Sequence, residues 1–117
     1  MTSTEFVLYR LSLSKFRSSF KLTKVDRDYV SKKGLAEIEQ HALEFITKRL
    51  APAILYKDGK QTPYKGHPVF KAQHATGTCC RTCMSKWHKI EKDKEMNTQE
   101  INKMVEIIMV WIRLQYH

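Results

Sequence analysis

All three cysteines and three of the five histidines of this chain lie in one segment, residues 66–88. Two residues separate Cys80 from Cys83, and His74 and His88 flank the pair. Two thiolates and two imidazoles suit a tetrahedral zinc ion, and the C-x2-C spacing is the usual nucleus of such a site. A bound zinc ion would also add folding free energy to a small domain. One interpretation is therefore a zinc site formed by His74, Cys80, Cys83 and His88.

A second interpretation places the same cysteines in the hydrophobic core. One continuous helix over residues 79–90 would present a buried stripe that consists of Cys80, Cys83, Met84, Trp87 and Ile90. Free cysteine behaves as a small core residue, so this stripe needs no metal. In such a helix His88 lies about 140° around the axis from Cys83, and one ion cannot bind both. The zinc interpretation therefore requires the helix to begin at or after Cys83, and requires the turn at residues 77–78 to bring His74 back.

Thiol chemistry is a third interpretation of the same cysteines. Cys80 and Cys83 have the C-x-x-C spacing of redox motifs, and a neighbouring Arg81 would lower the pKa of a thiol. The βαβ unit that precedes such a motif in thioredoxin-like proteins is absent from the sequence pattern.

An enzyme that acts on a phosphorylated or nucleobase substrate is a further hypothesis. Its polar groups would be His67, Lys71 and His74. Asp58 is the only carboxylate in residues 51–90, so the segment lacks an evident general base.

Positive charge is concentrated where the cysteines lie. The net charge is +9, and residues 51–90 carry seven basic side chains and one acidic side chain. A cationic surface poor in acids attracts polyanions through phosphate contacts and counterion release, and Tyr56 and Tyr64 are candidates for base stacking. We therefore expect a face within residues 57–89 that binds DNA, RNA or another polyanion. Its candidate residues, with one arginine nearer the N-terminus, are Arg17, Lys60, Lys65, His67, Lys71, Arg81, Lys86 and Lys89.

Length and composition indicate one globular domain over residues 1–117. A chain of 117 residues can form one hydrophobic core but not two, and 42% hydrophobic and 28% charged residues are ordinary values. No apolar run approaches the roughly 18 residues that span a membrane. The N-terminal residues lack a secretory signal pattern, and three cysteines make a poor disulfide framework. We expect a cytoplasmic protein with free or metal-bound thiols.

Hydrophobic periodicity predicts a compact all-α domain of five or six helices, with residues 1–10 as a flexible end. Capping pairs and glycine stops place the expected helices at residues 11–20, 23–34, 35–50, 68–75, 98–114 and in the cysteine segment after Thr78. The helix at 98–114 is apolar nearly all round, so we expect it to be the most buried helix. Residues 54–65 form either a small hairpin or an ordered loop, because Asp58-Gly59 favours a tight turn.

Several phrases of the sequence resemble a known family. Residues 66–90 read GHPVFKAQHATGTCCRTCMSKWHKI, and the phrases SKFRSSF at residues 14–20, RLAPA at 49–53 and DGKQTP at 58–63 precede them. In this order they resemble a family of small, mostly bacterial proteins known as a domain of unknown function, over residues 10–115. The resemblance implies a stand-alone cytoplasmic domain whose functional surface lies in residues 58–88, and it implies no particular activity or cofactor.

Overall fold

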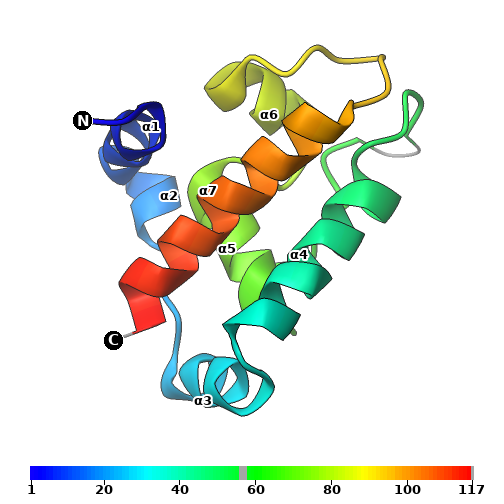
Figure 1. Cartoon of the computed structure of the whole chain (residues 1–117). Coiled ribbons are helices and arrows are strands. Elements are labelled where there is room, and N and C mark those ends of the chain that lie inside the picture. The colour runs from blue at the N-terminus through cyan, green and yellow to red at the C-terminus, as the bar shows by residue number, and fades with distance from the viewer. Residues whose placement is uncertain (56–57, 117) are drawn as a thin grey trace.

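The structure, a computed structural model, describes residues 1–55 and 58–116. This part of the chain contains seven helices and no strand (Figure 1). In chain order they are α1 (Ser3–Ser12), α2 (Lys15–Ser18), α3 (Lys24–Lys33), α4 (Leu35–Arg49), α5 (Pro68–Thr76), α6 (Arg81–His88) and α7 (Thr98–Tyr116). The all-α prediction is confirmed, and the expected five or six helices are slightly too few.

The N-terminal region explains the difference in helix number. Residues 11–20 do not form the one helix that their spacing predicts. Helix α1 begins within the expected flexible end, where the Thr2 hydroxyl accepts a hydrogen bond from the Glu5 backbone N–H at 3.0 Å. Ser14 then takes an extended conformation, and its hydroxyl accepts from the Arg17 backbone N–H at 3.2 Å. This second cap separates α2 from α1, and α2 packs against α5.

Three later helices have the boundaries that local sequence signals predict. Thr23 and Asp26 form a capping box in front of α3. Asn97 accepts from the Glu100 backbone N–H at 2.8 Å in front of α7. Helix α5 ends at Gly77, whose φ of 69° is left-handed. These boundaries follow from interactions within one helical turn, so they can be recognised without knowledge of the fold.

An irregular segment connects α4 to α5. The hairpin is absent from its described residues, and an ordered loop describes them instead. The predictions made for Tyr56 and Lys57 lie outside the described residues. Asp58, in the predicted turn, accepts from the Arg81 backbone N–H at 3.2 Å and from the Thr82 hydroxyl at 2.6 Å. The loop therefore caps the N-terminus of α6 from a distance in sequence.

The core lies where α4, α5 and α7 meet. Eight of the nine residues of α5 are buried, and Figure 1 shows this helix behind α7, with α4 beside α7. Helix α7 buries Ile108 and Ile112 against its neighbours but exposes Glu106 and Arg113. The prediction that the last helix is the most buried is therefore wrong, because α7 covers the core from outside and α5 crosses within it.

Among the described residues, no helix combines the length and the hydropathy needed to cross a membrane.

Candidate metal centre

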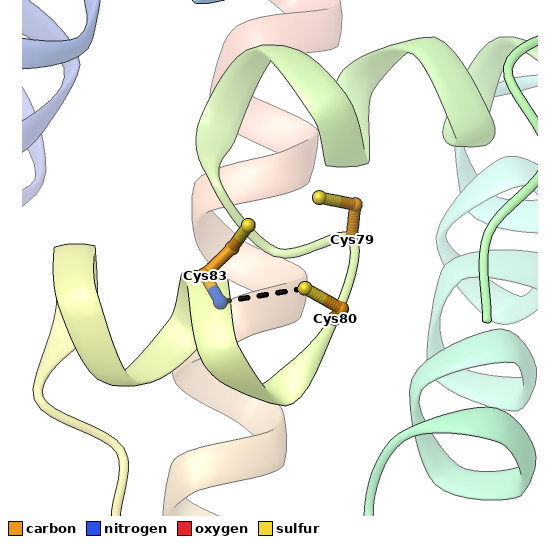
Figure 2. A group of neighbouring side chains, drawn as sticks. All are labelled: Cys79, Cys80 and Cys83. Carbon is orange, nitrogen blue, oxygen red and sulfur yellow. Dashed lines mark hydrogen bonds between the residues drawn. The ribbon is translucent and has the colours of Figure 1, made fainter. Parts of the chain in front are cut away.

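Three cysteine side chains converge between α5 and α6 (Figure 2). The Sγ atoms of Cys79, Cys80 and Cys83 all lie within 4.8 Å of one another. All three are free thiols; Cys79 and Cys80 are buried and Cys83 is partly exposed. Sulfur ligands of a tetrahedral zinc ion lie about 3.8 Å apart, given a Zn–S bond of about 2.3 Å. The group is thus close enough to hold a metal ion after a small inward movement.

The backbone between α5 and α6 brings the cysteines together. Helix α6 begins at Arg81, so the continuous helix expected over residues 79–90 does not form. Cys80 is the extended N-cap residue, and its Sγ accepts from the Cys83 backbone N–H at 3.4 Å (Figure 2). The turn that precedes it depends on Gly77, because a Cβ atom there would lie 2.7 Å from a ring carbon of Trp87. A left-handed glycine packed against Trp87 therefore lets α6 return against the end of α5.

A buried arginine from α2 completes the group. The side chain of Arg17 is 9% exposed. Its Nη1 donates to the backbone oxygen of His74 at 2.7 Å and to Cys79 Sγ at 3.5 Å, and its Nη2 donates to Cys83 Sγ at 3.0 Å. Arg17 forms no ion pair with a carboxylate of the described residues, and its only charged partners are cysteine sulfurs. A nearby anion stabilises a buried cation, so this arrangement favours a thiolate among the sulfurs that Arg17 contacts.

The pKa shifts of the group agree with this arrangement. Hydrogen bonds from Cys79 and Cys80, followed by Arg17, hold the pKa of Cys83 well below its ordinary value. Hydrogen bonds with the two other thiols, together with burial, raise the pKa of Cys79. Burial alone would lower the pKa of Arg17, but its bonds to the two sulfurs raise it. The directions of these shifts favour Cys83 as the thiol that ionises first, next to the guanidinium of Arg17.

The two histidines of the predicted zinc set bind backbone oxygens instead. His74 Nε2 donates to the oxygens of Thr62 at 3.2 Å and Pro63 at 3.1 Å. His88 Nε2 donates to the oxygen of Thr76 at 2.7 Å. Burial lowers the pKa of both rings, so both are neutral donors.

The structure thus brings together two of the four predicted ligands, Cys80 and Cys83. Within the described residues it adds Cys79 to them and does not bring His74 or His88 into the sulfur group. The position of Cys79 next to Cys80 in the sequence was a signal for this. The sequence pattern also placed Arg17 in an anion-binding face, whereas its guanidinium lies against the sulfurs.

The residues of the predicted polyanion face divide into two groups. Four lysines are exposed and form no ion pair with a described carboxylate: Lys60, Lys65, Lys86 and Lys89. The other residues make internal contacts. Arg81 is 3% exposed, and its guanidinium donates to the backbone oxygens of Leu50, Pro52, Glu91 and Lys94. Arg81 therefore holds the loops on either side of α6 together.

His67 and Lys71 also make internal contacts, near the start of α5. His67 Nδ1 accepts from the Val69 backbone N–H at 3.0 Å, which leaves its Nε2–H to donate to His41 Nδ1 at 3.0 Å. Lys71 forms a largely buried ion pair with Asp26. Both residues connect α5 to its neighbours.

A small all-helical protein with a cluster of three cysteines and a buried arginine is the class that this fold and site define. The chain belongs to the family described as "Domain of unknown function (DUF4186)", whose model matches residues 5–113. This match confirms the resemblance seen in the sequence. No solved structure matches the chain.

Proposed function

We propose that the protein binds a zinc ion through the thiolates of Cys79, Cys80 and Cys83. The observation that carries this proposal is the buried guanidinium of Arg17, which donates to two of the three sulfurs and has no carboxylate partner in the described chain. Hydrogen bonds from such a donor stabilise thiolates that bind a metal and orient them toward it. The same bonds have no comparable role in a neutral hydrophobic core.

Formal charges favour a divalent ion in this group. Three thiolates, one divalent cation and the guanidinium of Arg17 sum to zero charge. Three thiolates without a metal would leave two uncompensated negative charges in a mostly buried site, which is costly. A zinc ion bound here would thus allow all three cysteines to be deprotonated at neutral pH.

The donor set also limits the kind of metal. Thiolates are soft ligands that select zinc, copper(I) or iron over magnesium and calcium. Three protein ligands leave one position of a zinc tetrahedron for water or another donor. Free thiols and a thiolate-bound metal suit a reducing compartment, so we also propose a cytoplasmic location.

Elemental analysis of freshly purified protein tests the proposal. We expect about one equivalent of zinc for each chain, removed by a strong chelator together with a rise in the reactivity of the three thiols. Cys79→Ser and Cys83→Ser should each lose the metal, whereas His74→Gln and His88→Gln should keep it. Circular dichroism of each variant checks that the helices are intact, and the chelator experiment on the unaltered protein does not depend on any variant.

Two outcomes would contradict the proposal. Metal-free protein whose thiol reactivity does not respond to added zinc or to chelator would remove it. Loss of zinc in His74→Gln and His88→Gln, with zinc retained in Cys79→Ser, would instead support the ligand set predicted from the sequence.

A second proposed function is weak binding of nucleic acid or another polyanion. It is supported by the four exposed lysines defined above, which have no ion-pair partner among the described carboxylates. Exposed, unpaired lysines are available for phosphate contacts, and they attract polyanions at low salt. The contacts of His67 and Lys71 within the fold give no support to an enzyme that would use them as free polar groups.

A further inference from the structure

A second basic site lies away from the cysteines, between α1, the end of α6 and the start of α7. An open pocket of about 290 Å³ is present there, and its lining contains no aspartate or glutamate. The basic residues that line it come from three helices and one helix cap: Arg10, His88, Lys89 and Lys103. A pocket with several cations and no acid in its lining has a positive potential, which favours an anionic ligand.

The cations of this pocket are only partly neutralised by the protein. The Arg10 side chain is exposed, and its guanidinium lies 5.6 Å from the centre of the Trp87 ring. Lys103 Nζ is held by the Thr4 hydroxyl at 2.9 Å, with the nearest Glu106 oxygen at 3.9 Å. Lys89 is exposed and forms no ion pair with a described carboxylate. Three positive groups, from α1, α7 and the C-cap of α6, therefore line one pocket.

His88 also lines this pocket, at the C-terminal end of α6. Its Nε2–H is occupied by the oxygen of Thr76 at 2.7 Å. Its pKa is lowered first by burial and then by the positive charges of Lys103, Arg17 and Arg10. The ring is therefore neutral and does not add to the positive charge that an anion would meet.

The rest of the pocket is apolar and aromatic. Phe6 and Trp87 provide two aromatic side chains, and Phe6 is 54% exposed. Ile90, Met104 and Ile107 form a buried apolar base beneath them. Small-molecule sites commonly combine such an apolar wall with a few polar groups that fix the orientation of the ligand.

We propose that this pocket binds a small organic phosphate with an aromatic body, of which a nucleoside monophosphate is the simplest example. The phosphate would lie between Arg10 and Lys103, because a dianionic group has the charge and the acceptor oxygens to engage both cations. The aromatic body would lie against Phe6 and Trp87. This inference does not depend on zinc, since neither Arg10 nor Lys103 contacts a cysteine sulfur in the described structure.

Titration of the complete, isotope-labelled protein with adenosine monophosphate tests the inference by NMR. We expect saturable shifts of the Trp87 indole signal, with the Trp111 indole signal as an internal reference. Arg10→Gln and Lys103→Gln should each weaken binding about tenfold, the usual effect of losing one charged hydrogen bond. Lys15→Gln and Lys65→Gln make the same charge change at exposed positions outside the pocket and should leave the affinity unchanged.

Further probes identify which part of the ligand the pocket recognises, and whether the ligand is a free nucleotide or the end of a nucleic acid. Adenosine and inorganic phosphate should each bind more weakly than adenosine monophosphate, and a short oligonucleotide with a 5′-phosphate should compete with it. The inference would be overturned if adenosine bound as tightly as adenosine monophosphate, or if Lys65→Gln weakened binding as much as Arg10→Gln and Lys103→Gln. It would also be overturned if millimolar adenosine monophosphate did not shift the Trp87 indole signal. Binding of the oligonucleotide alone would also overturn it, in favour of the polyanion surface. Arg10 makes no ion pair with a described carboxylate, so its variant remains informative if Lys103→Gln fails to fold.

Discussion

At the scale of single residues, Arg17 is the side chain on which the proposed metal site most depends. Its guanidinium has donors in a fixed planar fork, and two of its nitrogens donate to Cys79 and Cys83. A lysine at this position would keep the charge but could not donate to two sulfurs from one rigid plane. In the proposed zinc site, the fork rather than the charge alone would therefore orient the thiolates.

The variant Arg17→Lys tests this role. We expect it to weaken zinc binding by about 10- to 100-fold, as is usual when a group that hydrogen-bonds to a metal ligand is removed. Competition with a chromogenic zinc chelator measures the affinity. Arg49→Lys is the matched control, because Arg49 is exposed and its guanidinium lies over the Phe45 ring, away from the sulfurs. Equal affinities of the two variants would show that Arg17 has only a packing role.

At the scale of elements, the junction between α5 and α6 positions the cysteine cluster. It depends on Gly77, which is left-handed and lies in close contact with Trp87. Gly34, between α3 and α4, also has a positive φ of +87°, with a ψ of 148°, but a Cβ atom there would have no heavy atom within 4 Å. Both glycines therefore have a positive φ, and only Gly77 lies in a crowded position.

Comparison of Gly77→Ala with Gly34→Ala separates these two effects. Both changes should lower the free energy of unfolding by about 1–3 kcal/mol through backbone strain. Gly77→Ala should have an additional cost of roughly 1–3 kcal/mol, because the new methyl group must displace the Trp87 ring. Urea denaturation measures both values, and the metal content of Gly77→Ala should fall as well. A smaller loss of stability for Gly77→Ala than for Gly34→Ala would show that α6 can shift freely.

At the scale of the whole molecule, the formal net charge of +9 includes two arginines, Arg17 and Arg81, that the fold buries. Arg17 and Arg81 are within the protein, so only the exposed basic residues can act on a large partner. Any polyanion binding should therefore be electrostatic and sensitive to salt, without the specificity that buried, oriented donors provide.

A salt titration with a single-stranded oligonucleotide tests the polyanion proposal. We expect the logarithm of the binding constant to fall linearly with the logarithm of the salt concentration. The pair of changes Lys86→Gln and Lys89→Gln should reduce the slope by about one for each phosphate that the protein no longer neutralises. The control pair Lys32→Gln and Lys48→Gln removes the same number of positive charges, from α3 and α4. Equal effects of the two pairs, or no binding at low salt, would contradict a defined face.

Much of the fold follows from the sequence because its signals act over a few residues. The capping pair Thr23–Asp26 and the stop at Gly77 are examples, since each satisfies backbone groups within one turn. The burial of α5 could not be predicted in this way. Gln73 and Thr76 are polar, and they are tolerated in the core because they donate to the backbone oxygens of Thr78 and Ala72.

The sequence by itself determined that this chain is helical, basic and supplied with soft ligands in one short segment, because composition and local capping are properties of neighbouring residues. Only the tertiary structure decided which groups meet. It joined Cys79 to Cys80 and Cys83, bonded His74 and His88 to backbone oxygens, and placed Arg17 against the sulfurs. The physical reason is that these contacts depend on how α2, α5 and α6 and the loops between them pack, and no local sequence pattern records that packing.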